Sequence, residues 1–464
     1  MNPRALCSLL IVGLGTLVVP LDSSVNIDFP YIVRRFDLAI PMIQWVVISY
    51  VLTQTSLLLS FGRIGDILGY RRIFLLGTGI STAAFIACAA APSYGWLLAG
   101  RVAQGIGAGL ILAVGPALAT SLFPEEQRAR VLGHYMMMFG LGAALGPSVF
   151  GLVVERFGWS AVFAFRAPLA GAAFLLAWTL PKSPRADRQE TFDMAGGLLL
   201  ALGLSLFLLA LNRLREPLWF ALCAIACIVA FRLFIRRQNL ARRPIINLGL
   251  FRDSTFTMVN LAFALTNLAL FSIMLLSPFY LSNVSGLSAP VAGLVLATSP
   301  LGIMVAAPLA GRAISRLSSW AVAIAGMTLI AIGLAGVSLA NEMPHELALS
   351  AAMFVAGFGM GLFQVAYFDI LTVTIPQRDR GVAGALGMAT RSIGTVTGAT
   401  VLMLVFQTRQ SSQGLVPALQ LSFLVAAAIP AVLVPLVAWQ RTRIRRAAAL
   451  PATRDTGKRV RPGP

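Results

Sequence analysis

Charged residues are scarce in this chain. Asp, Glu, Lys and Arg make up 11% of its 464 residues, whereas hydrophobic residues make up 58%, and the mean hydropathy is +0.83. A soluble protein carries about 25% charged residues. The composition therefore excludes an ordinary soluble globular protein. It predicts an integral membrane protein, most of whose length lies in the lipid bilayer.

Residues that build catalytic and metal centres are also rare. The chain has only two histidines, His134 and His345, which fall on opposite sides of the predicted membrane layout. The four cysteines all lie in apolar stretches and form no CxxC pair, so we interpret them as small buried apolar residues. No GxxxxGK[ST] phosphate loop is present. We therefore expect no enzyme, no primary pump, no cofactor and no metal site, which would need about four clustered ligands.

Acidic residues are outnumbered by basic ones, 17 to 36, which gives a net charge of +19. Such an excess could indicate nucleic-acid binding. Most of the arginine, however, falls on one side of the predicted membrane layout: Arg63, Arg71 and Arg72, the run from Arg232 to Arg252, and the tail RTRIRR. This asymmetry is the positive-inside bias of cytoplasmic loops. Because no compact basic domain lies outside the apolar runs, we expect no nucleic-acid partner.

Long apolar runs fill the rest of the sequence. Since a span needs about 20 mostly apolar residues, we predict an all-α protein with about fourteen transmembrane helices. They run near 6–29, 41–61, 73–91, 95–121, 130–154, 160–180, 193–212, 217–235, 254–282, 289–310, 319–340, 347–373, 382–406 and 416–439. An even number places both termini on the arginine-rich, cytoplasmic side of a bacterial inner membrane. No A-x-A cleavage site follows the first run, so we expect it to be retained. The polar tail after Ala447 is predicted to be disordered.

The sequence repeats itself at offsets near 250 residues. GRIGD (62–66) matches GRAIS (311–315), QGIGAGL (104–110) matches AGFGMGL (356–362), and ARVLG (129–133) matches RGVAG (380–384), all in the same order. The repeat predicts two parallel six-helix units, 1–181 and 254–440, with an inserted helix pair and linker at 182–253 and a basic tail at 441–464. This arrangement resembles that of the major facilitator transporters, which hold substrate between the halves near the middle of the membrane.

Two carboxylates interrupt the first apolar run, in VPLDSSVNIDFP (19–30). A charge deep in a membrane helix costs about 2.5–3.5 kcal/mol on insertion scales, so it usually has a partner or a function. Asp22 lies roughly 24 Å from the inner end and Arg101 roughly 9 Å from the outer end at 1.5 Å per residue. In a core about 30 Å thick these depths nearly coincide. We therefore expect Asp22 and Arg101 to pair or exchange a proton, with a solely structural ion pair as the alternative. Asp28, just before Pro30, is interpreted as a solvated helix-end charge.

Further polar residues fall at the same depth. Asn26 lies one turn above Asp22, Gln104 lies one turn from Arg101, and Arg166 enters from the sixth span. We predict that these five residues line a proton-coupling and substrate cavity, with Asp369 and Arg391 as candidates in the second half. The additional buried arginine favours a polar or anionic substrate over a lipophilic cation.

The segment GRIGDILGYRR (62–72) is the most specific pattern in the chain. Glycines permit a tight turn and close helix approach, and Asp66 amid arginines can latch two helices together. The predicted gating-loop residues are Gly62, Arg63, Asp66, Gly69, Arg71 and Arg72. The alternative is a solvated loop that only sets topology. The segment resembles the cytoplasmic loop signature G-x-L-a-D-r-x-G-r-k of the major facilitator superfamily. The second half keeps Gly311, Arg312 and Arg316, whereas Ser315 replaces the acid.

Several motifs resemble the fourteen-helix drug:proton antiporter branch of that superfamily. LDSSVNIDFP is similar to its first-helix signature L-D-x-T-I-V-N-V-A-L-P; QWVVISYVL (44–52), R-x-x-Q-G (101–105) and FDMAG (192–196) also fit. The resemblance covers about residues 15–440. It implies that Asp22 is the first-helix carboxylate, Arg101 the helix-4 arginine and Asp66 the loop acid. The sequence departs from the branch at Asp28, where alanine is usual, and at Arg166, where asparagine is usual.

The fifth predicted span, GLGAALGPSVFG (140–151), resembles the glycine–proline signature of the antiporters. Gly142, Gly146 and Pro147 match it, while Phe150 replaces the first of its paired glycines. Pro147 could bend the helix. The alternative is ordinary packing of small residues between helices.

The resemblance implies a proton-coupled secondary transporter of small organic molecules that works by alternating access. An exporter of drugs or toxic compounds is the favoured function. A nutrient, vitamin (for example riboflavin) or metabolite permease is the alternative. A channel is disfavoured by the repeated halves and the latch segment. The expected partners are a small-molecule substrate, protons and the lipid bilayer, and we expect a monomer.

Overall fold

The computed structural model describes residues 3–38, 40–181, 193–213, 216–241, 244–245, 248–285, 287, 289–340, 346–375 and 380–449. All regular secondary structure in these residues is helical. Within the described residues, thirteen helical segments are long and apolar enough to cross a membrane. A further helix, α6, has 30 residues, or about 45 Å, which exceeds the thickness of a bilayer core. The predicted all-α membrane fold is confirmed.

The helices follow one another with short connections. In chain order they are α1 (Pro3–Val18), η1 (Pro20–Asp28), α2 (Phe29–Phe36), η2 (Ile40–Ile43), α3 (Gln44–Leu68), α4 (Tyr70–Ala89), α5 (Tyr94–Ser121), η3 (Glu125–Gln127), α6 (Arg128–Phe157), α7 (Trp159–Ala164), α8 (Arg166–Ala177), α9 (Met194–Asn212), α10 (Pro217–Leu240), η4 (Leu248–Arg252), α11 (Ser254–Asn283), α12 (Ala289–Ile314), α13 (Ser319–Ala340), α14 (Glu346–Thr374), α15 (Arg380–Gln413) and α16 (Leu415–Ala449).

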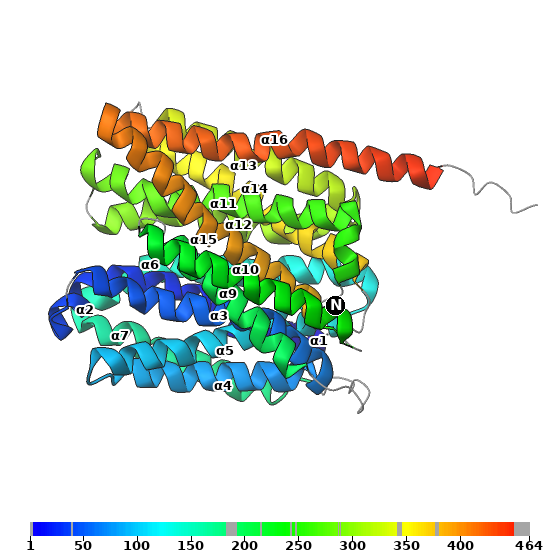
Figure 1. The fold of residues 1–464 in the computed structure, drawn as a ribbon, viewed down its shortest axis with the longest axis horizontal. Helices are drawn as coiled ribbons and strands as arrows, with labels where there is room; N and C mark the ends of the chain where they lie inside the picture. The colour runs from blue at the N-terminus through cyan, green and yellow to red at the C-terminus, as the bar shows by residue number, and fades with distance from the viewer. Residues whose placement is uncertain are drawn as a thin grey trace, which may run out of the picture.

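The long helices run side by side and form two groups (Figure 1). Helices α1 to α8, coloured blue to cyan, make up one half, and α11 to α16, coloured green to red, make up the other. Helix α9 packs against α10 and contacts α3 of the first half and α15 of the second. The inserted pair therefore lies along the junction of the halves.

Glycines of the sequence repeat make equivalent contacts in both halves. Gly105 of α5 packs against α3 and Gly107 against α4, while 252 residues later Gly357 of α14 packs against α12 and Gly359 against α13. A Cβ atom on Gly357 would lie 1.9 Å from the Ser299 carbonyl oxygen. Such approaches are possible only without a side chain. The repeat is therefore one of helix packing as well as of sequence.

The glycines of α6 and α15 follow the same rule. A Cβ atom on Gly142 would lie 2.3 Å from the carbonyl oxygen of Leu17, and one on Gly394 would lie 2.2 Å from that of Ala264. Gly146 likewise abuts η1. The glycines that resemble the antiporter signature thus seat α6 against the first span. Helix α6 continues past position 147 to Phe157, and the Pro147 side chain lies outside the described residues.

The first span, predicted near 6–29, is present, since Ala5–Val25 is long and apolar enough to cross a membrane, but it is not one continuous α-helix. Helix α1 ends at Val18 and is followed by η1; bonds between residues three apart run from Val19 N to Thr16 O (3.2 Å) at the junction and from Asp22 N to Val19 O (3.1 Å) at the start of η1. Pro20 explains the change, because it has no N–H to donate to Thr16 O and its ring clashes with the preceding turn. The sixth span is likewise divided, into α7 and α8, around Phe165.

Two other boundaries differ from prediction. The segment 62–72 is not a loop: α3 continues to Leu68 and α4 begins at Tyr70, so only Gly69 separates them. Gly69 has φ of +93°, a conformation that glycine adopts without strain. At the C-terminus, α16 runs to Ala449 instead of ending at 439. The first part of the predicted tail 441–464 is therefore helical, and residues 450–464 lie outside the described residues.

The halves pack tightly at one end of the bundle, which we call the arginine-rich end. It contains Gly69, η3 and the α12–α13 connection. A Cβ atom on Gly133 of α6 would lie 2.5 Å from Ala307 O of α12, and one on Gly311 of α12 would lie 2.7 Å from Ala129 O. Helix α15 packs against α3 and α5. The structure is therefore closed between the halves at this end.

Candidate functional site

Asp22 is the centre of a buried polar cluster. Arg101 donates two hydrogen bonds to its carboxylate, from Nη1 to Oδ1 (2.6 Å) and from Nη2 to Oδ2 (2.8 Å). Gln104 Nε2 and Arg166 Nη1 donate to Oδ1 at 2.8 and 3.1 Å. The Asp22 side chain is 12% exposed and both arginine side chains are 0% exposed. The predicted pairing of Asp22 with Arg101 therefore forms, in the bidentate geometry that makes such pairs strong, and Arg166 joins it.

The backbone and neighbouring rings hold Arg101 in place. Its Nε donates to the Val46 carbonyl of α3 at 2.8 Å, and its Nη1 also donates to Gln104 Oε1 at 2.8 Å. The guanidinium lies 4.5 Å from the centroid of the Tyr50 ring, a cation–π contact. The sequence interpretation missed the role of Tyr50. The position of this polar aromatic residue in the second span, within QWVVISYVL, could have indicated that role.

Arg166 enters the cluster from the start of α8. It donates to the Ser24 hydroxyl of η1 as well as to Asp22. Its guanidinium carbon lies 5.0 Å from the centroid of the Phe150 ring, and the rings of Phe85 and Phe163 are also close. The break after α1 makes this possible, because η1 presents both Asp22 and Ser24. The cluster thus links four segments: η1, α3, α5 and α8.

The described side chains of the cluster combine one carboxylate with two guanidiniums. Their formal sum is +1, from one negative and two positive groups. The carboxylate accepts four hydrogen bonds, so its desolvation is compensated. The predicted members Asn26 and Asp28 have side chains outside the described residues.

Asp66 connects the two halves at the arginine-rich end. Its Oδ2 accepts a hydrogen bond from Val382 N, in the first turn of α15, at 3.2 Å, and its Oδ1 accepts one from the Tyr70 hydroxyl at 2.8 Å. A carboxylate at a helix N-terminus satisfies an orphan N–H and interacts favourably with the helix dipole. Arg71 donates instead to the Trp178 carbonyl that follows α8.

The other residues of the predicted gating segment surround this contact. Arg63 and Gly62 are buried, and Arg72 is exposed. A Cβ atom on Gly65 would lie 2.4 Å from the Val114 side chain of α5, so this glycine brings α3 and α5 together. The segment therefore has latch geometry, but as a helix end and not as a loop.

A second set of charges also bridges the halves at this end. Asp369 of α14 accepts hydrogen bonds from Arg128 Nε of α6 (3.3 Å) and from Ser319 Oγ (2.6 Å). Arg128 also donates to Glu125 (2.6 Å), which accepts another bond from Arg380 of α15. Asp369, predicted as a membrane-interior candidate, thus belongs to an inter-half network. Sequence reasoning missed Arg128, Glu125 and Arg380, because the pairs that join the halves, Arg128 with Asp369 and Arg380 with Glu125, are 241 and 255 residues apart.

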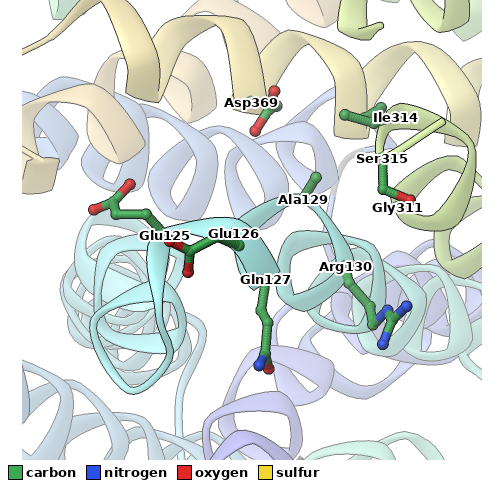
Figure 2. Close-up of a pocket in the computed structure, with 9 residues that line it drawn as sticks. All are labelled: Glu125, Glu126, Gln127, Ala129, Arg130, Gly311, Ile314, Ser315 and Asp369. Atoms are coloured by element: carbon green, nitrogen blue, oxygen red, sulfur yellow. The ribbon is translucent and has the colours of Figure 1, made fainter. Parts of the chain in front are cut away.

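A cavity of about 270 Å³ lies beside this network. Figure 2 shows the side chains of η3 and the start of α6 on one side, with Asp369 and Ser315 across from them. The residues that line it are Glu125, Glu126, Gln127, Ala129, Arg130, Gly311, Ile314, Ser315 and Asp369. Ser315 is the repeat counterpart of Asp66, and its hydroxyl donates to Arg312 O at 2.7 Å. At this junction, the second half therefore has a serine where the first half has the Asp66 carboxylate.

Arg391, the other second-half candidate, does not join the Asp22 cluster. It lies on α15, and its guanidinium carbon is 4.1 Å from the centroid of the Phe139 ring of α6, in the other half. The side chain is half-buried.

Known proteins share this organisation. The Major Facilitator Superfamily model matches residues 12–399. The chain is 28% identical over 392 residues to the riboflavin transporter RibZ of Clostridioides difficile (strain 630), covering 84% of this chain and 86% of that one. It is 28% identical over 408 residues to the multidrug resistance protein Stp of Mycobacterium tuberculosis (strain CDC 1551 / Oshkosh), covering 87% and 76%.

A solved structure shows the same fold. The proton:xylose symporter XylE bound to 6-bromo-6-deoxy-D-glucose superposes with a TM-score of 0.68 at 17% identity, covering 94% of this chain and 95% of that one. The family match spans most of the sequence, and the paired six-helix halves agree with it. The chain belongs to the major facilitator superfamily and is a multi-pass membrane transporter.

Proposed function

We propose that this transporter exports small organic molecules in exchange for protons, by alternating access. One observation carries the proposal: Asp22 is an almost fully buried carboxylate whose donors come from two other helices, α5 and α8. A movement of either helix relative to η1 would change how many guanidinium donors the carboxylate has. The proton affinity of a buried carboxylate depends on such neighbours, so the movement would couple proton uptake and release to conformation.

The inter-half contacts support alternating access. The hydrogen bond from Val382 N to Asp66 joins α15 to α3, and the pair of Arg128 and Asp369 joins α6 to α14. Both lie at the arginine-rich end, and both must break before the halves can separate there. We assign this end to the cytoplasm because of its arginine content. The present conformation would then be closed to the cytoplasm.

Reporter fusions test this orientation. Fusions after residues 185, 245 and 445 should all report a cytoplasmic location, since these regions contain much of the arginine. A periplasmic signal at 245 would contradict the fourteen-helix topology with cytoplasmic termini.

The relatives support two directions of transport. The multidrug resistance protein Stp favours export, whereas the riboflavin transporter RibZ, equally similar at 28% identity, favours a vitamin or nutrient permease as the alternative. Uptake and efflux of riboflavin and of an apolar organic acid, in cells with and without a proton gradient, separate the two.

Asp22→Asn tests the coupling. The variant keeps the shape of the side chain but cannot titrate. In proteoliposomes it should lose transport driven by a proton gradient, while exchange of substrate at equal pH on both sides continues. Glu346→Gln, at an exposed carboxylate in the first turn of α14, is the matched control. Undiminished gradient-driven transport by Asp22→Asn would remove Asp22 from the coupling mechanism.

A further inference from the structure

Arg391 and Phe139 occupy equivalent positions in the two halves. Gly142 of α6 corresponds to Gly394 of α15, an offset of 252 residues, and 139 plus 252 gives 391. Parallel repeats are related by a pseudo-two-fold axis along the membrane normal. Two equivalent positions lie at the same distance from that axis, on opposite sides of it. If the side chains at two equivalent positions touch, the axis must pass between them. The 4.1 Å contact of the Arg391 guanidinium with the Phe139 ring therefore places Arg391 at the centre of the molecule, between the halves.

Arg391 also lies where the tight packing of α15 ends. Residues 382–389 of α15 are all buried, whereas among residues 390–400 only Gly394 and Gly398 are buried. Arg391 is 11 residues beyond Arg380, or about 16 Å along the helix, near the middle of a core about 30 Å thick. The guanidinium is thus partly accessible at mid-membrane depth, and it faces the other half and not the lipid.

No carboxylate among the described residues balances the charge of Arg391. Among the described residues, the structure gives it no hydrogen bond and no carboxylate partner; its neighbours include the face of the Phe139 ring and Tyr135. Arg101, Arg128 and Arg380 are each ion-paired. Asp22 does not neutralise Arg391, because the guanidiniums of Arg101 and Arg166 already share its single negative charge. An ionisable group inside a membrane protein either forms an ion pair or marks a substrate pathway. Because Arg391 has no ion-pair partner among the described residues, it fits the second case.

We infer that Arg391 binds the acidic group of the transported molecule, and that the substrate is an organic anion with an apolar body. This inference rests on the proposed transport function, since it names the class of its substrate. A planar guanidinium matches a carboxylate in a two-bond geometry. The Phe139 ring beside it contacts the apolar body, while a lipophilic cation is repelled by the same charge. Arg391 is then the residue that sets the charge specificity of the site.

Matched probes test the inference on the full-length chain. The purified protein is placed in phosphatidylcholine nanodiscs, without a gradient, and binding is measured for biphenyl carboxylate, biphenyl carboxamide and biphenylmethylammonium. These share one apolar body and differ in charge. Wild type should bind the carboxylate most tightly. Arg391→Gln should weaken carboxylate binding by about 10- to 100-fold, the range of charge-assisted hydrogen bonds, and leave the carboxamide almost unaffected.

Three further variants make the result decisive. Arg391→Lys keeps the charge and should retain more carboxylate affinity than Arg391→Gln. Arg391→Met is a second neutral variant of similar length, in case the glutamine variant does not fold. Arg409→Gln removes an exposed charge from the far part of the same helix and should bind like wild type. Unchanged carboxylate binding in both neutral variants, equal affinity of wild type for all three probes, or no saturable binding of the carboxylate would each overturn the inference. Because no gradient is present, these outcomes are independent of the Asp22→Asn transport result.

Discussion

The two halves of the molecule share their packing and differ in their buried charge. Gly146 abuts Leu21, and Gly398 abuts Leu268, so η1 and α11 correspond with an offset of 247 residues. Asp22 then corresponds to Ala269 (22 plus 247). With the offset of 252 between α5 and α14, Arg101 corresponds to Met353 and Gln104 to Ala356. Ala269, Met353 and Ala356 are all fully buried.

This difference distinguishes the residues that are required for folding from those that are required for function. Both six-helix units pack through the same glycines, so these glycines belong to the fold. Among the described residues, the second half has apolar side chains at the three positions equivalent to Asp22, Arg101 and Gln104. Replacing a buried ion pair by apolar residues of similar volume is often neutral or stabilising. The Asp22 cluster is therefore not a packing requirement of the unit, which favours a role in transport.

The arginine-rich end shows the same kind of asymmetry. Asp66 at the end of α3 accepts a hydrogen bond from the first turn of α15, whereas Ser315 at the end of α12 borders a cavity beside the start of α6. The carboxylate contact proposed as a latch is thus found on one side, although the helices that form it are repeated.

The largest effect on stability is expected when a single residue of the Asp22 cluster is replaced by the residue found at the equivalent position of the second half. Arg101→Met leaves Asp22 buried with Arg166 as its remaining guanidinium donor, and should lower the free energy of unfolding by about 3 kcal/mol. Thermal unfolding of the purified protein in detergent measures this. Met353→Leu, at the equivalent position, should change stability by less than about 1.5 kcal/mol. Equal losses in the two variants would mean that the halves do not differ in this way.

Alanine at equivalent glycines should have similar effects in both halves. A Cβ atom would lie 2.7 Å from Tyr50 O in Gly105→Ala and 1.9 Å from Ser299 O in Gly357→Ala. Overpacking of this kind costs about 1–3 kcal/mol. Gly95→Ala, where nothing lies within 4 Å, is the control in the same assay. A large loss for one glycine and none for its counterpart would contradict a shared scaffold.

The smallest change is expected at the one-sided latch. Asp66→Asn keeps the contact with Val382 N but removes its charge, which weakens it by about 1 kcal/mol. The closed state at this end would then lose about a factor of five in population, and transport in vesicles should fall while membrane insertion stays normal. Ser315→Ala should transport like wild type, so equal defects in both variants would show that the latch is not one-sided.

The expected membrane depth of the polar residues, together with the sequence repeat, predicted much of the site. The pairing of Asp22 with Arg101 followed from counting residues from opposite ends of two spans, and the arrival of Arg166 at the same level followed in the same way. Hydropathy could not show the break after Val18, because apolarity does not report the missing N–H of Pro20. It also gave no sign that α3 continues to Leu68, since charged residues usually mark loops.

Contacts between the halves could not be predicted. The partner of Asp66 in the other half is a backbone N–H 316 residues away, at Val382. The contact of Arg391 with Phe139 depends on how the halves meet. The repeat offset relates these two positions, but only the structure brings them together.

One variant tests directly whether the first-half charge cluster serves transport and not folding. In the combined replacement Asp22→Ala, Arg101→Met and Arg166→Met, the first two positions take the residues of their second-half counterparts, Ala269 and Met353, and Arg166, which would otherwise be left buried without Asp22, also becomes apolar. Its unfolding temperature and its gradient-driven transport are measured on the same proteoliposome preparation. We predict a folded protein at least as stable as wild type that transports nothing against a gradient. A protein that fails to fold, or one that still transports with the proton gradient, would contradict this account.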